Sequence, residues 1–253
     1  MKKFLIAIVM AVLPLAANAA GGGAQLDHMA VDLDNKASLQ RGMKTFVNNC
    51  MGCHSAQYQR FERAADDLGI PKALVEKHMI FGDQKVGEQM TIAMSAADAA
   101  NWFGNPPPDL SLEARLRGPD WIYTYLRSFY KDESRPYGVN NVVFPDVGMP
   151  NVLEHLQGVQ VMNCTPEEKA ASHGKVDPLT GKSMDNCTSI VKAGELTPEE
   201  FDQVAYDLTN FMAYIGEPYK QDSQRIGTYV LIFLFFFFFV AFALKKEFWR
   251  DVH

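Results

Sequence analysis

The sequence predicts a mainly α-helical protein, with one exported domain that has long loops and a single C-terminal transmembrane helix. Three observations predict this class. The chain of 253 residues has long apolar stretches at both ends, two segments between them repeat apolar residues at helical spacing, and the 18 glycines and 13 prolines follow no repeat. The hydrophobic content of 47% is too high for a disordered chain.

Residues 1–19 have the three parts of a signal peptide. Lys2 and Lys3 form a short basic region, and an almost wholly apolar run follows them. Ala17 and Ala19 are small residues at the two positions that a signal peptidase inspects. The apolar run is shorter than the roughly 20 residues that span a bilayer, which argues against an uncleaved anchor. We therefore expect cleavage after Ala19 and export of the mature chain.

The first of two expected domain helices begins near Ser38, which can cap it. Its apolar face carries residues at helical spacing: Leu39, Met43, Phe46, Val47 and Cys50. The second helix begins at Thr197, where a cap, a proline in the first turn and a glutamate at position 200 form a capping box, and it ends at Gly216. We expect these two helices to pack together at the centre of a small all-α domain.

A CxxCH motif, Cys50 to His54, directly follows the first helix. Two thiols at this spacing can add across the vinyl groups of one haem, and the adjacent histidine can then ligate the iron. A thioredoxin-like redox pair would need an early βαβ pattern, and a structural zinc site would need a second paired-ligand motif. Since neither is visible, the motif predicts one haem c bound covalently by Cys50 and Cys53, with His54 as an axial ligand.

The residues alone do not decide which side chain is the sixth iron ligand. Candidates are the twelve methionines and the other five histidines, which are His28, His78, His155, His173 and His253. Met149 differs from most methionines because it lies in an irregular Pro/Gly segment, residues 144–150, which can lay an extended backbone over a haem face. A thioether would raise the reduction potential relative to imidazole, as suits an electron carrier.

Two further cysteines, Cys164 and Cys187, lie in the long segment between residues 151 and 194. In an exported protein, two leftover cysteines most simply form a disulfide. Closing a loop of this length would contribute about 3 kcal/mol by the chain-entropy model. The alternative is two free buried thiols.

The C-terminal transmembrane helix is expected at Ile226–Leu244, 19 residues without a charge. Five consecutive phenylalanines leave no polar face, which argues against a core helix of a soluble domain. Lys245, Lys246 and Arg250 follow the span, and positive residues stay on the cytoplasmic side. The expected organisation is a signal peptide (1–19), a periplasmic haem domain (20–225), a transmembrane anchor (226–244) and a cytoplasmic tail (245–253).

The formal charge of −6 argues against a nucleic-acid-binding protein, which would need a basic face. The signal peptide carries +2 and the tail +1, so residues 20–225 carry −9. An acidic domain at a membrane surface would attract a basic soluble partner. The alternative is that this charge only keeps the domain soluble.

These residues together resemble the cytochrome c1 family, the haem subunits of the cytochrome bc1 complex (ubiquinol–cytochrome c reductase), over essentially the whole mature chain. The motifs that carry the resemblance are Cys50-Met51-Gly52-Cys53-His54, Asn105-Pro106-Pro107-Pro108-Asp109-Leu110-Ser111, Gly148-Met149-Pro150 and the single C-terminal span with its basic tail. The resemblance implies a cytochrome c-like fold, with Cys50 and Cys53 bound to haem, His54 as proximal ligand and Met149 as distal ligand.

The resemblance also implies a role for Arg117, which matches the family position that pairs with a haem propionate. The alternative is a solvated arginine at the flank of a helix. Trp121 stands where the family usually has a tyrosine near a propionate, and an indole N–H can donate one hydrogen bond but cannot accept one. The proline run would make the haem edge rigid.

The function implied is transfer of single electrons, within the respiratory chain, from a Rieske iron–sulfur subunit to a c-type cytochrome. The partners would be cytochrome b and the Rieske subunit, in a dimeric complex of the bacterial inner membrane. No bond is made in a substrate, so we expect no enzyme activity of the chain on its own. Alternatives are an anchored monohaem cytochrome serving another oxidase or reductase, a haem sensor or peroxidase with five-coordinate iron, and a structural assembly subunit.

Overall fold

The computed structural model describes residues 26–164 and 187–251, so the expected signal peptide lies outside the described residues. Within them the protein is mainly helical, as predicted. The helices are α2 (Lys36–Asn49), α3 (Phe61–Leu68), α4 (Lys72–His78), α5 (Ala96–Phe103), α6 (Glu113–Arg117), α7 (Pro119–Arg127), α8 (Glu154–Gln157), α10 (Pro198–Gly216) and α11 (Lys220–Phe248). The strands are β1 (Ala56–Arg60), β2 (Gln89–Met90), β3 (Phe129–Lys131), β4 (Val139–Asn141), β5 (Gly158–Met162) and β6 (Thr188–Ala193).

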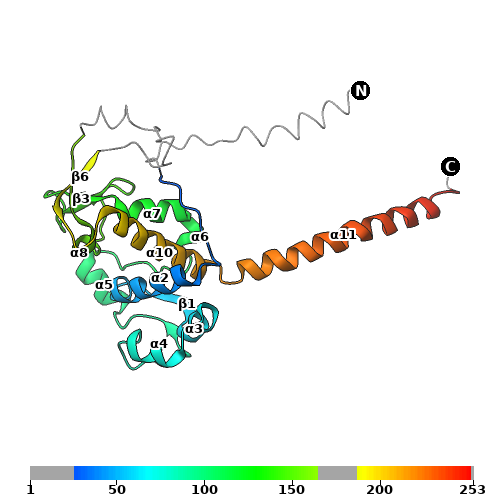
Figure 1. Cartoon of the computed structure of the whole chain (residues 1–253), viewed down its shortest axis with the longest axis horizontal. Coiled ribbons are helices and arrows are strands. Elements are labelled where there is room, and N and C mark those ends of the chain that lie inside the picture. The colour runs from blue at the N-terminus through cyan, green and yellow to red at the C-terminus, as the bar shows by residue number, and fades with distance from the viewer. Residues whose placement is uncertain (1–25, 165–186, 252–253) are drawn as a thin grey trace.

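The centre of the domain is the packing of α2 on α10, which confirms the predicted pairing of the two helices (Figure 1). The rings of Phe46 and Phe211 meet with centroids 5.6 Å apart, and both side chains are fully buried. Gly42 makes this close approach possible, because a Cβ at this position would lie 2.0 Å from the carbonyl oxygen of Asp207. The same aspartate, itself buried, accepts a hydrogen bond of 2.6 Å from Ser38 Oγ.

The starts of these two helices differ in how well they were predicted. Thr197 caps α10 with the expected capping box: its side chain accepts from the Glu200 N–H, and the Glu200 carboxylate accepts from the Thr197 N–H. The prediction that Ser38 caps the first helix is wrong. Asn35 is the cap, its side chain accepts from the Ser38 N–H, and Ser38 turns inward to Asp207.

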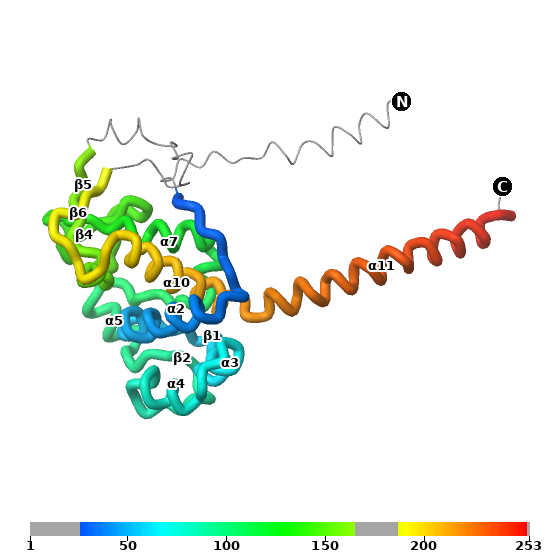
Figure 2. Tube along the Cα trace, viewed as in Figure 1, coloured from blue at the N-terminus to red at the C-terminus, as the bar shows by residue number. Residues whose placement is uncertain are grey.

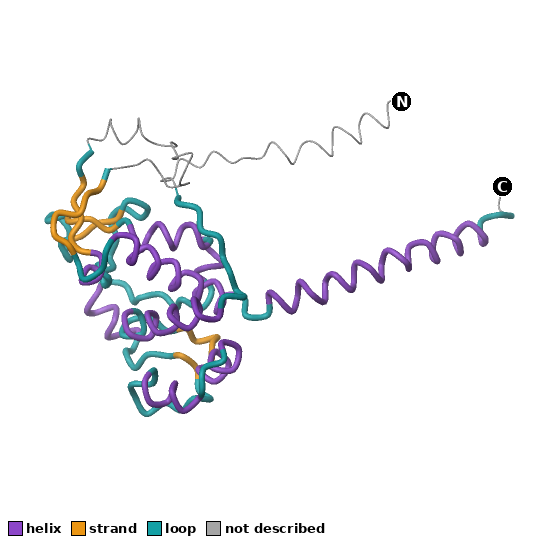
Figure 3. The backbone as a smooth tube through the Cα atoms, in the orientation of Figure 1, coloured by secondary structure: helices purple, strands orange, loops and turns teal. Residues whose placement is uncertain are grey.

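Three two-stranded antiparallel sheets, none of them predicted, lie within the described residues. β1 pairs with β2, β3 with β4, and β5 with β6. The β3–β4 and β5–β6 hairpins lie on the side of the domain away from α11 (Figure 3). The β5–β6 pair brings together the two ends of the segment that holds Cys164 and Cys187. The two cysteines form a disulfide, as predicted, with their Cα atoms 4.9 Å apart.

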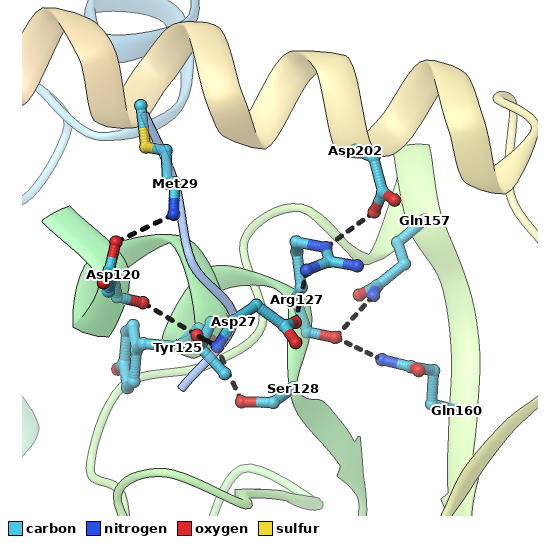
Figure 4. A network of polar contacts seen from close by, with 10 residues as sticks. Asp27, Met29, Asp120, Tyr125, Arg127, Ser128, Gln157, Gln160 and Asp202 are labelled. Atoms are coloured by element: carbon cyan, nitrogen blue, oxygen red, sulfur yellow. Dashed lines mark hydrogen bonds and ion pairs between the residues drawn. The ribbon is translucent and has the colours of Figure 1, made fainter. Parts of the chain in front are cut away.

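The chain enters the domain as a segment without helix or strand, residues 26–34, that leads to α2 (Figure 2). Arg127, at the end of α7, attaches this segment to α10. Its guanidinium lies 2.6 Å from a carboxylate oxygen of Asp27 and 2.6 Å from one of Asp202. The Arg127 carbonyl also accepts hydrogen bonds from the side chains of Gln157 and Gln160 (Figure 4). One residue thus joins the entering segment, α7, α10 and β5.

Helix α11 leaves the domain and extends away from it (Figure 1). Among the described residues it is the one helix long and apolar enough to cross a membrane. Its 29 residues would measure about 43 Å, more than the roughly 30 Å of a bilayer's hydrocarbon core. The helix contains the expected span, residues 226–244, and begins six residues before it.

Candidate functional site

The CxxCH motif forms a tight turn at the end of α2. The N–H groups of Cys53 and His54 both donate to the carbonyl of Cys50, at 3.0 and 2.9 Å. Cys50 is buried, Cys53 is half-buried, and the two thiols are not bonded to each other. Burial, and secondarily the neighbouring Cys53, raises the pKa of the Cys50 thiol to about 12. A thioredoxin-like redox pair has a cysteine with a lowered pKa, and the pKa of the Cys50 thiol is shifted in the opposite direction.

The imidazole of His54 is held by the proline run. Its Nδ1 lies 2.7 Å from the carbonyl oxygen of Pro108, and in the tautomer in which Nδ1 carries the proton it donates to that oxygen. The opposite nitrogen, Nε2, then keeps its lone pair for a metal, the arrangement usual for a metal-ligating histidine. Burial lowers the pKa of His54, although the Pro108 bond opposes this, so the neutral ring is favoured.

The proline run is itself attached to the segment after the motif. The Leu110 N–H donates to the Ser55 carbonyl at 2.8 Å, and the Gln57 N–H donates to the Asp109 carboxylate at 2.9 Å. The second oxygen of Asp109 accepts from the Ser111 N–H. These bonds fix the backbone that positions the Pro108 carbonyl.

Met149 lies in the loop that follows β4, beside α7. It packs with a small buried cluster of Phe129, Val139 and Val147, and its sulfur lies 3.4 Å from the hydroxyl of Tyr125. Burial raises the pKa of this tyrosine, so its hydroxyl stays protonated at neutral pH. Tyr125 also packs against the main core, to which Cys50 belongs. One side chain therefore contacts both hydrophobic clusters, the small one beside Met149 and the main core.

Arg117 lies at the end of α6, with its guanidinium 4.3 Å from the centre of the Trp121 ring and 5.4 Å from that of Phe144. Its Nε donates to the Glu113 carboxylate at 2.9 Å. Trp121 in turn stacks on Tyr125, with centroids 4.8 Å apart. The arginine therefore lies in the same group of side chains as Met149, and its role toward a propionate stays a prediction.

Three of the rival histidines lie in described segments other than the CxxCH turn and the loop of Met149. His28 pairs with Asp120, and His78 and His155 lie in α4 and α8. His173 and His253 lie outside the described residues. Across residues 26–164 and 187–251, no cluster of three or more histidine, cysteine or carboxylate side chains is placed to hold a metal ion.

The residues fit a covalently bound haem. Cys50 and Cys53 offer two thiols one turn apart, and the Pro108 carbonyl orients His54 with one ring nitrogen free to ligate. The residue that sequence reasoning missed is Tyr125. Tyr125 follows Trp121 by four residues, which places both rings on one face of the helix. The same spacing is typical of ordinary core residues.

Comparison with known proteins agrees with a haem-binding site. The model of the Cytochrome C1 family matches residues 26–252. A cytochrome c1 of Allochromatium vinosum is 49% identical over 253 residues, the whole of both chains. A Nitrosomonas europaea protein named ammonia monooxygenase gamma subunit is 42% identical over 252 residues, 100% of this chain and 98% of its own. Cytochrome c1 of Rhodobacter capsulatus is 22% identical over 285 residues, covering 98% of this chain and 97% of its own.

Proposed function

The chain belongs to the cytochrome c1 family, and we propose that it passes single electrons from a Rieske iron–sulfur subunit to a c-type cytochrome. Membership makes it a membrane-anchored electron-transfer subunit of the cytochrome bc1 type, with a c-type haem. The observation that carries the proposal is the CxxCH turn at the end of α2, with His54 held by the Pro108 carbonyl. Cytochrome b and the Rieske subunit are the proposed partners, in a dimeric complex.

Five residues would hold one haem c. Cys50 and Cys53 would form the thioether bonds, His54 and Met149 would ligate the iron, and Arg117 would pair with a propionate. Once bound, the haem supplies a one-electron ferric–ferrous couple.

The chain's own contribution is to hold this site rigid. No group has to move a proton or attack a substrate, since electrons pass without bond formation. The prolines restrict the loop that carries the Pro108 carbonyl, and the Asp109 bonds attach that loop to the motif. A fixed edge supports reproducible docking of two successive partners.

The membrane arrangement is part of the same proposal. Residues 1–19 act as the signal peptide, 20–225 form the periplasmic domain, 226–244 span the inner membrane and 245–253 remain cytoplasmic. The cluster Lys245, Lys246 and Arg250 supports this orientation. The span keeps the haem domain close to the membrane, where a tethered iron–sulfur domain can reach it.

A second candidate is an anchored cytochrome serving another oxidoreductase, and the name of the Nitrosomonas europaea relative favours keeping it. Purifying the full chain by a C-terminal tag in mild detergent separates the two. We expect cytochrome b and an iron–sulfur protein to co-purify, one haem to be bound by Cys50 and Cys53, and quinol to reduce it. A haem-loaded chain that co-purifies with a different oxidoreductase, and is not reduced by quinol, would contradict the proposal.

A further inference from the structure

We propose that Tyr125 is a positioning residue for the sixth iron ligand. Its phenol donates a hydrogen bond to the thioether of Met149, which holds the sulfur in place and raises the reduction potential of the site. The inference rests on the proposed function, because it concerns how Met149 serves as a ligand.

The contact is direct. The Tyr125 hydroxyl lies 3.4 Å from Met149 Sδ, within the range of a hydrogen bond to sulfur. Within the described chain, the thioether is the one acceptor that this hydroxyl reaches. Both side chains are half-buried, so water reaches the bond only in part. A thioether is a weak acceptor, and the bond therefore depends on the ring being held in place.

The ring of Tyr125 is held by two other aromatic side chains. Trp121, one helical turn earlier on α7, stacks on it with an interplanar angle of 11°. Phe129, from β3, meets it edge to face with centroids 5.1 Å apart. These contacts leave the ring little freedom to swing, so the hydroxyl keeps its direction toward the sulfur.

A buried amide connects the helix to the loop that carries the ligand. Asn141, which is fully buried, donates from Nδ2 to the Tyr125 carbonyl at 2.8 Å. Its Oδ1 accepts from the N–H groups of Val143 and Phe144, at 2.9 and 3.1 Å. One side chain thus fixes both the backbone of Tyr125 and the start of the loop that ends at Met149.

The hydrogen bond is expected to change the reduction potential because it changes how much electron density the sulfur donates to the iron. A hydrogen bond to Sδ withdraws electron density that the sulfur would otherwise donate to iron. The ferric state depends more on that donation, so the bond favours the ferrous state and raises the potential. Removing the hydroxyl should lower the potential and also make the sulfur easier to displace.

The test replaces Tyr125 by phenylalanine in the full haem-loaded chain, because Tyr125→Phe keeps the ring contacts and removes only the hydroxyl. We expect a lower midpoint potential, and imidazole should displace Met149 from the ferric protein at several-fold lower concentration. Tyr123→Phe is the matched control, since that ring lies over Arg127, 4.5 Å from its guanidinium carbon, away from the ligand. The control should equal the wild type in both measurements.

Wild-type values of both quantities in Tyr125→Phe would overturn the proposal. Met149→Leu separates that failure from a wrong ligand: if its near-infrared sulfur-to-iron band survives, the assignment of Met149 fails, whatever Tyr125 does. Should Tyr125→Phe not fold, a fluorinated tyrosine at the same position keeps the structure and is a stronger donor. It should raise the potential and weaken imidazole binding, and unchanged values would again overturn the proposal.

Discussion

Replacing Gly42 by alanine should force apart the two helices at the centre of the domain. The added Cβ would lie 2.0 Å from the Asp207 carbonyl oxygen and 2.7 Å from the Phe211 Cβ. Ordinary van der Waals contact begins near 3.4 Å, so α2 and α10 would have to separate by about 1.4 Å. The nearest atom belongs to the backbone, which cannot rotate away as a flexible side chain can.

The magnitude follows from two opposing effects. Overpacking of a dense core costs roughly 3 kcal/mol at a contact this close, while alanine gains about 1 kcal/mol over glycine in a helix interior. The net loss of about 2 kcal/mol corresponds to a fall in Tm of roughly 4–8 °C for a domain of this size. The shift would also move Asp207 relative to its buried partner Ser38.

The assay is thermal unfolding of the full haem-loaded chain in detergent, followed by near-ultraviolet circular dichroism. Gly227→Ala is the control, because this helical glycine of α11 has no atom within 4 Å of an added Cβ and receives the same gain in helix propensity. We expect a lowered Tm for Gly42→Ala alone. A Tm at or above that of the wild type would refute the argument that Gly42 is required for the close approach.

Three further predictions concern the ligand, the disulfide and the partner. Met149→Leu should abolish the weak near-infrared sulfur-to-iron band of the ferric protein, and persistence of the band would mean that another group ligates the iron. Mass spectrometry without reduction should find Cys164 bridged to Cys187, and alkylation of both thiols in the native protein would disprove this. Because Cys187→Ser removes the bridge, it should loosen the chain between residues 151 and 194. Reduction of a basic soluble cytochrome c by the complex should slow as salt rises, mainly in the association rate, because the screening length falls to about 8 Å at 0.15 M. A salt-independent second-order rate would place the −9 charge of residues 20–225 away from the docking surface.

Features that depend on a few neighbouring residues could be predicted from the sequence. The capping box at Thr197 needs only the residues up to Glu200, and the structure has it as predicted. The apolar span needs only its own composition, and α11 contains it. The spacing of Cys50 and Cys53 predicts a haem site, because the chemistry of the attachment requires that spacing.

Other features depended on contacts between distant segments. The residue type of Ser38 favours a helix cap, but its hydroxyl donates a hydrogen bond to the buried carboxylate of Asp207, 169 residues later. Asn35 caps the helix in its place. The β1–β2 and β3–β4 pairs were missed because β2, β3 and β4 have only two or three residues, too few for an alternation to be recognised. The β5–β6 pair was missed because β6 is exposed along most of its length and shows no alternation of buried and exposed residues.

The CxxCH motif, the apolar span and the two amphipathic helices could be recognised in the sequence, since local spacing and apolar periodicity encode them. Which side chains lie beside His54 and Met149 depends on contacts between distant segments, which the tertiary structure alone reveals. Nothing distinguishes Tyr125 from other aromatic core residues until the loop after β4 places Met149 beside its hydroxyl. In the same way, the Pro108 carbonyl supports His54 only because folding brings residues 54 positions apart within 2.7 Å, and such proximity depends on the packing of the whole domain.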